Sequence, residues 1–349
     1  MWDWGVIDLI EQTYTLPHLR LAGVVLRMAN SVDSAHLPTL KVIALHGWLD
    51  NAYSFLPLFE HWKAYPELFS AYSSVECVAV DFAGHGLSDW RPEGGYYYYL
   101  ESVRDIVHLV DTLGWSQFTL LGHSLGAGVA LVLAGLFPER IEKLIALEGI
   151  GPHLSLPEKS WILQMRQLLA QEKKRLQLSD HKMGHPKADD PKADDPKVDD
   201  PKVDDPARAE KKKSGYASVD DAVNARIKGN VTGVIDQHAV HLLCRRGLMQ
   251  VDQRWVWRTD PRLLWPSPVR FQEEQVLALF QCITAPVLVI LAKDSHLMRQ
   301  SYLAERLQAL QKLSYLTFAG DHHFHMSQAL FTISTAILEF LPIVHDPSI

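Results

Sequence analysis

The chain has 349 residues, of which 47% are hydrophobic and 21% are charged, and its formal net charge at pH 7 is -7. This composition is typical of a globular protein that buries its own core, and it excludes a wholly disordered chain or a collagen-like fibre. The negative charge argues against a general nucleic-acid binder. We therefore expect no nucleic-acid partner.

The three cysteines, Cys77, Cys244 and Cys282, are expected to be reduced thiols in a long intracellular chain. The sequence contains no C-x-x-C motif and no Cys/His spacing typical of metal ligands, so no metal site is expected. The N-terminus lacks the basic and apolar segments of a signal peptide, and no apolar stretch approaches the ~20 residues that span a bilayer. These features predict a cytoplasmic protein with no membrane span and no metal.

Short apolar runs alternate with helical patterns along most of the chain. Runs that are apolar throughout predict strands buried on both faces of a parallel sheet, and they lie at residues 40–46, 75–82, 118–121, 143–147, 286–291 and 313–318. Apolar residues at three- and four-residue spacing predict helices at 103–113, 127–136, 303–313 and 333–341. Residues 13–21 and 23–28 predict an antiparallel hairpin. The fold class expected is α/β, with a doubly wound, mostly parallel sheet.

The alternation is interrupted between residues 152 and 275, where the sequence is rich in helical patterns and contains no clear sheet strand. This segment predicts an inserted helical cap between two parts of the core, at residues 1–151 and 276–349. Within it, P-K-[AV]-D-D occurs four times in succession, and a proline every five residues prevents a continuous helix. We expect a disordered tract at about 182–213.

Residues 122–126 form the motif G-x-S-x-G between a predicted strand and a predicted helix. Such a tight turn presents a serine hydroxyl at the end of a strand, so Ser124 is the predicted nucleophile. The start of the following helix points the N–H of Leu125 at a developing oxyanion. Trp48, in the His-Gly-Trp segment after another strand, is the expected second donor.

A nucleophilic serine needs a base. Residues 320–325, GDHHFH, follow the last predicted strand and should lie at the same sheet edge as Ser124. His323, which precedes an aromatic residue and a helix, is the preferred base, and His322 is the alternative.

The acid that orients the base has two candidates, each at the end of a predicted strand. Asp294 stands where the order Ser…Asp…His would place it and is preferred. Glu148, which directly ends an earlier strand, remains open as the alternative.

Together these segments resemble the α/β-hydrolase fold superfamily, and within it the serine hydrolase-like branch. The resemblance is carried by LHGWLDNAYSF, DFAGHGLSD, LLGHSLGAG, LEGIGP and GDHHFHM, covers about 14–155 and 270–342, and weakens over the cap, where WRTDPRL also matches. It implies carboxylic-ester hydrolysis without a cofactor. The branch usually has a glycine three residues before the aspartate after the penultimate strand. Here Ala292, Lys293 and Asp294 bring the carboxylate one position early.

The hypothesis is a two-step acyl transfer on a small-molecule ester with a small or medium acyl group. A serine at position 124 argues against the epoxide hydrolases and dehalogenases of the superfamily, which use a carboxylate nucleophile. The alternatives are a slow-turnover or non-enzymatic ligand sensor on the same scaffold, and a hydrolase of thioesters, lactones or carbon–carbon bonds.

Overall fold

The computed structural model describes residues 4–30, 37–152, 158–183, 215–229 and 235–342. Its centre is an eight-stranded sheet in the order β1-β2-β4-β3-β5-β6-β9-β10. Strands β3, β4, β5, β6, β9 and β10 are parallel, whereas β2 is antiparallel to both β1 and β4. The strand bounds are Trp4–Thr15 (β1), Arg20–Asn30 (β2), Thr39–Leu45 (β3), Ser74–Val80 (β4), Phe118–His123 (β5), Ile141–Leu147 (β6), Val287–Ala292 (β9) and Leu313–Phe318 (β10).

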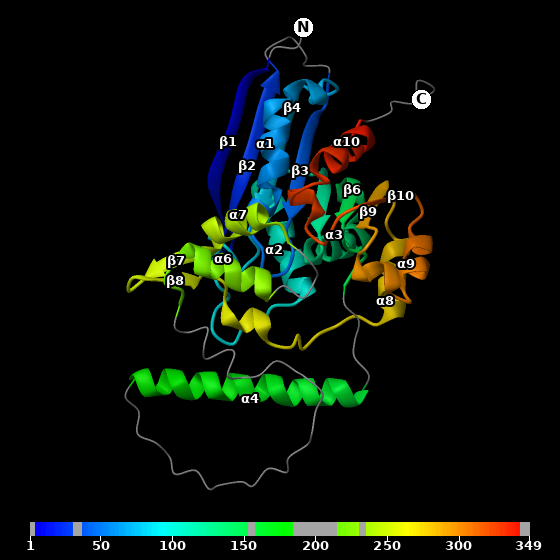
Figure 1. Cartoon of the computed structure of the whole chain (residues 1–349). Helices are drawn as coiled ribbons and strands as arrows, with labels where there is room; N and C mark the ends of the chain where they lie inside the picture. The colour runs from blue at the N-terminus through cyan, green and yellow to red at the C-terminus, as the bar shows by residue number, and fades with distance from the viewer. Residues whose placement is uncertain (1–3, 31–36, 153–157, 184–214, 230–234, 343–349) are drawn as a thin grey trace.

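Helices cover both faces of this sheet, as a doubly wound fold requires (Figure 1). One apolar core joins the sheet to helices α2, α3, α8 and α9, and the other joins it to α1 and α10. Their bounds are Leu56–Ala64 (α1), Tyr99–Thr112 (α2), Leu125–Leu136 (α3), Glu273–Gln281 (α8), Leu303–Ala309 (α9) and Leu330–Phe340 (α10). The predicted α/β class and its mostly parallel sheet are confirmed.

Two predicted boundaries are wrong. The predicted first strand, at 13–21, spans the turn between β1 and β2, because β1 lies at the sheet edge and lacks a continuous apolar run. The predicted helix at 303–313 ends at Ala309, and Leu313 instead begins β10. Apolar spacing continues across that boundary because the helix and the strand pack into the same core.

The segment between β6 and α8 contains α4 (Glu158–Met183), α6 (Val219–Lys228) and α7 (Gln237–Gly247). It also contains a hairpin, β7 (Leu248–Val251) with β8 (Arg254–Trp257), so the expectation of no strand here is wrong. Each strand has four residues, which is too short to produce a distinct sequence period. The exact cap limits stay a prediction. The repeats lie outside the described residues, as does the predicted disordered tract except for residues 182–183, which are helical at the end of α4.

Every helix in the described part of the chain is too short or too polar to traverse a lipid bilayer. All three cysteines are free thiols, as expected. Cys77 and Cys244 are buried, and Cys282 is exposed.

Candidate active site

Ser124 occupies a sharp turn between β5 and α3, with φ of 52° and ψ of -113°. A non-glycine residue with positive φ is strained, and the surrounding packing holds it in place. A Cβ on Gly122 would lie 2.5 Å from the Ala127 nitrogen, and one on Gly126 would overlap the Leu45 carbonyl oxygen. The two glycines therefore let α3 pack closely against β5 and β3, while Ser124 stays partly exposed.

The hydroxyl of Ser124 lies against an imidazole and a carboxylate. Its Oγ is 2.9 Å from Nε2 of His322, and Nδ1 of that ring is 3.1 Å from Oε2 of Glu148. Because an ionised carboxylate only accepts hydrogen bonds, Nδ1 carries the proton and donates it to Glu148. Nε2 is then free to accept the serine proton, which is the arrangement required of a general base.

Glu148 is held in one orientation by further hydrogen bonds. It follows β6 with a φ of 49° and is almost completely buried. Its Oε1 accepts from the Ala292 backbone N–H at 2.5 Å, and its Oε2 accepts from the Ser295 hydroxyl at 2.8 Å. The carboxylate therefore links the ends of β6 and β9 while it faces His322.

The prediction that His323 is the base is wrong, because His323 does not face Ser124. Nε2 of His323 bonds to Oδ2 of Asp50 at 3.1 Å, and the alternative candidate His322 faces Ser124. These two histidines are neighbours in one loop, and their rings are nearly perpendicular at 87°. Which of two adjacent side chains faces the serine depends on the path of that loop.

The preferred acid is also misplaced. Asp294 is exposed in the turn after β9, whereas Glu148 bonds to His322. The turn directs Ser295, one position later, toward the carboxylate of Glu148. The early position of Asp294 in its motif was the sequence signal that favoured the alternative.

Both expected oxyanion donors follow strands that end at this edge of the sheet. Leu125 begins α3, and Trp48 follows β3 in a turn where its indole N–H donates to the Leu263 carbonyl at 3.1 Å. The next residue, Leu49, has a φ of 62°, and its N–H donates to Nε2 of His85 at 3.2 Å. The assignment of the Leu125 and Trp48 N–H groups as oxyanion donors stays a prediction.

A buried polar network around Asp81 stabilises the loop that follows the Trp48 turn. The carboxylate of Asp81 accepts hydrogen bonds from the N–H groups of Ala52 and Leu87, both at 2.7 Å, and from Arg246 Nε. Asp81 and His85 thus satisfy backbone N–H groups beside the site, which gives both side chains a structural role.

Several histidines beside the site are buried as neutral rings. Burial lowers the pKa of His46 to about 4 and the pKa of His85 and of His325 to about 3. An unfolded histidine titrates near 6.5, so below that pH the unfolded chain binds protons that the folded chain does not. The folded state should therefore lose stability on acidification.

Acidification from pH 6.5 to 5.5 is expected to lower the free energy of unfolding by about 1 kcal/mol for each of these histidines. Urea titrations at the two pH values measure the change. His325→Gln should remove the contribution of about one proton from the slope of the free energy of unfolding against pH. A stability that is constant across this range would contradict the neutral, buried state of these rings.

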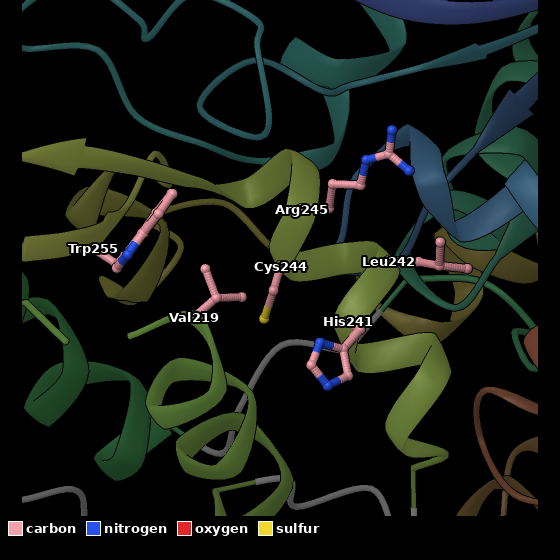
Figure 2. Close-up of a pocket in the computed structure, with 6 residues that line it drawn as sticks. All are labelled: Val219, His241, Leu242, Cys244, Arg245 and Trp255. Carbon is pink, nitrogen blue, oxygen red and sulfur yellow. The ribbon is translucent and has the colours of Figure 1, made fainter. Parts of the chain in front are cut away.

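A hollow of about 390 Å³ lies among α6, α7 and β8 (Figure 2). It is lined by Val219, His241, Leu242, Cys244, Arg245 and Trp255. None of these residues contacts Ser124 through a hydrogen bond found in the described part of the chain. The carbonyl group of a substrate attacked by Ser124 should therefore lie beside Ser124 and not in this hollow.

Residues 42–179 match a family model described as the alpha/beta hydrolase fold. A serine hydrolase-like protein of Danio rerio is 27% identical over 86% of this chain and 81% of its own length. Serine hydrolase-like protein 2 of Homo sapiens is also 27% identical, over 87% of each chain. Similarity over this share of the chain is too long to be confined to the residues before α4 and after α7.

A solved structure of a hypothetical protein from Pseudomonas aeruginosa PAO1 is 30% identical, covers 95% of this chain and 99% of its own, and has a TM-score of 0.70. A thioesterase domain from the curacin biosynthetic pathway, 16% identical with a TM-score of 0.63 over 95% of this chain and 98% of its own, shares the fold. The fold and the serine hydrolase-like relatives support a hydrolase activity.

Proposed function

Because this chain belongs to the α/β-hydrolase superfamily and to its serine hydrolase-like branch, we propose that it is a serine hydrolase of carboxylic esters with small or medium acyl groups. The observation that carries the proposal is the 2.9 Å contact between Ser124 Oγ and His322 Nε2, with Glu148 on the other side of the ring. The partial exposure of Ser124 allows a small substrate to reach it.

In the acylation step, His322 Nε2 takes the Ser124 proton as Oγ attacks the ester carbonyl carbon. Glu148 stabilises the imidazolium that forms. The backbone N–H groups of Leu125 and Trp48 stabilise the negative charge on the carbonyl oxygen. His322 then gives its proton to the departing alkoxide, and an acyl-Ser124 ester remains.

In the deacylation step, His322 removes a proton from a water molecule that attacks the acyl-enzyme. The tetrahedral intermediate collapses, the acid product leaves, and the proton on His322 returns to Ser124 Oγ. Both steps use the same base in alternate roles, so a single side chain controls both rates.

Labelling with a serine-directed phosphonate tests this proposal. The wild-type protein is expected to gain one adduct per chain, located on Ser124 by peptide mass spectrometry, because this hydroxyl is both partly exposed and next to a base. Ser54 Oγ also lies 2.9 Å from an imidazole nitrogen, that of His325 Nε2, but Ser54 is buried. Ser124→Ala should gain none while keeping the wild-type circular dichroism spectrum. A native wild-type protein that stays unlabelled would count against any serine hydrolase.

A panel of activated esters with graded acyl length, together with a thioester and a lactone, tests the substrate class. The highest kcat/KM is expected for small or medium acyl esters. A single turnover followed by a lasting complex would favour the ligand sensor. A preference for the thioester or the lactone would assign the same residues to that class of substrate.

A further inference from the structure

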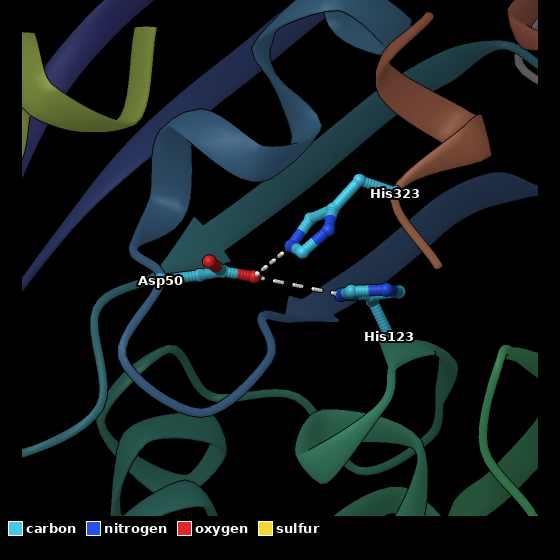
Figure 3. A group of neighbouring side chains, drawn as sticks. All are labelled: Asp50, His123 and His323. Carbon is cyan, nitrogen blue, oxygen red and sulfur yellow. Dashed lines mark hydrogen bonds and ion pairs between the residues drawn. The ribbon is translucent and has the colours of Figure 1, made fainter. Parts of the chain in front are cut away.

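A second group of titratable side chains consists of Asp50, His123 and His323, which Figure 3 shows facing one another. Two of them are chain neighbours of the proposed triad, because His123 precedes Ser124 and His323 follows His322. Asp50 is in the loop after β3, His123 ends β5, and His323 precedes the last 3-10 turn. Oδ2 of Asp50 is 3.1 Å from Nε2 of His323 and 3.7 Å from Nδ1 of His123. All three residues are buried, and their three atoms lie within 4.8 Å of one another.

The proton on His123 can be assigned from its neighbours. Its Nε2 lies 2.7 Å from the carbonyl oxygen of His322, which only accepts, so Nε2 carries the proton. Burial and the neighbouring histidines hold the pKa of His123 well below its ordinary value, so the ring has no second proton near neutral pH. Nδ1 therefore presents a lone pair.

That lone pair faces a carboxylate. Although burial alone would raise it, the pKa of Asp50 is held well below its usual range by His323 and Arg226, so Asp50 is ionised. Within the described residues, Nδ1 of His123 has no hydrogen-bond partner. Two buried acceptors thus face each other with no proton between them, an unfavourable contact that a cation would convert into two bonds.

Gly47 keeps side-chain atoms out of the space beside these two acceptors. A Cβ at this position would lie 2.8 Å from Asp50 Oδ2 and 2.9 Å from His123 Nδ1. The chain therefore passes both atoms closely while leaving room between them for a small ion.

We propose that Asp50 Oδ2, His123 Nδ1 and His323 Nε2 bind one divalent transition-metal ion, for which Zn²⁺ is the best match. Two imidazole nitrogens and one carboxylate oxygen suit Zn²⁺, which binds them at about 2.0–2.2 Å and accepts a fourth ligand. The bond from His123 Nε2 to a backbone carbonyl is the outer contact that commonly orients a metal-binding histidine.

Binding requires a proton shift on His323. Nε2 now donates to Asp50, so this proton must move to Nδ1, which has no partner among the described residues, or be released. The site is separate from Ser124 and His322, and its existence does not depend on whether the protein turns over an ester.

Arg226 of α6 opposes the metal. Its guanidinium pairs with Oδ1 of Asp50, and its Nη1 donates to the Leu49 carbonyl at 2.9 Å. A positive charge this close weakens binding of a divalent cation. Removing the charge of Arg226 should therefore tighten metal binding. A substitution that merely destabilised the fold would weaken metal binding instead.

Titration of the metal-free, untagged, full-length protein with Co²⁺ tests the proposal, with Zn²⁺ as the competitor. Cys282→Ser is the background, because Cys282 is an exposed thiol that could bind metal itself. We expect one Co²⁺ to bind per chain and to give the visible absorption bands of an ion with a low coordination number. Addition of Zn²⁺ should abolish these bands. The absence of such stoichiometric binding would overturn the proposal.

Variants locate the ion. Asp50→Asn and His323→Gln should each weaken binding by roughly 10-fold or more, and Arg226→Gln should strengthen it several-fold. His241→Gln, which removes a half-exposed imidazole near Asp220, is the matched control and should change nothing. His322→Gln should retain the ion, and loss of binding in that variant would place the metal at the proposed triad and overturn the assignment. The assignment would also be overturned if Asp50→Asn, His323→Gln and Arg226→Gln, each tested as a single variant, all kept the wild-type metal affinity.

Discussion

His322→Gln is expected to lower kcat/KM by roughly 10⁴-fold or more, whereas its neighbour His323→Gln should lose less than about 10-fold. Glutamine cannot accept the Ser124 proton and later return it, so both acylation and deacylation fail. His323 touches Asp50 and not the serine, and its loss affects activity only through the position of the loop.

Initial rates on one activated ester, measured for both variants under identical conditions, decide between the two histidines. Thermal unfolding of each protein provides the control, since a misfolded variant would also be inactive. If His323→Gln is inactive while His322→Gln retains nearly full activity, the order of the two side chains proposed here is wrong.

Glu148→Gln should reduce kcat by about 10³- to 10⁴-fold, whereas Asp294→Asn should change it by less than about 3-fold. A neutral amide cannot stabilise the imidazolium charge. Its NH₂ group can also face Nδ1 and favour the tautomer with the proton on Nε2, where it blocks transfer from Ser124. Asp294 is exposed and makes no comparable contact with His322.

These two substitutions are a matched pair, because each converts one carboxylate into an amide of the same size. Single-turnover measurement of acyl-enzyme formation separates the chemical step from product release. Comparable activity losses in both variants would show that the two acids share the role, and a loss confined to Asp294→Asn would restore the order of the usual motif.

The core of the fold was predictable because its information is local. Strands β3, β4, β5, β6 and β9 each contain at least four consecutive buried residues, so they are visible in short windows of sequence. The edge strand β10 is more exposed, but it still contains a short run rich in apolar residues. The edge strand β1 and the hairpin β7-β8 were missed or misplaced. An edge strand alternates in burial, and a four-residue strand contains too few residues to show a period.

The position of Ser124 was equally local. Its turn needs small residues at 122 and 126, and both the glycines and the flanking strand and helix stand within one short segment. The sequence therefore determined the sheet, its helices and the elbow that presents a hydroxyl at a strand end.

Only the tertiary structure decided which imidazole and which carboxylate meet that hydroxyl. His322 and Ser124 are separated by 198 positions, and His322 and Glu148 by 174, so no local pattern encodes their contacts. The path of the 321–325 loop decides which of His322 and His323 faces the serine. Two long-range hydrogen bonds hold that path, one from His123 of β5 to the His322 carbonyl and one from His323 to Asp50. The hydrogen bonds from Ala292 and Ser295 likewise orient Glu148 across a strand boundary, because neighbouring strand ends in a parallel sheet come from distant parts of the chain.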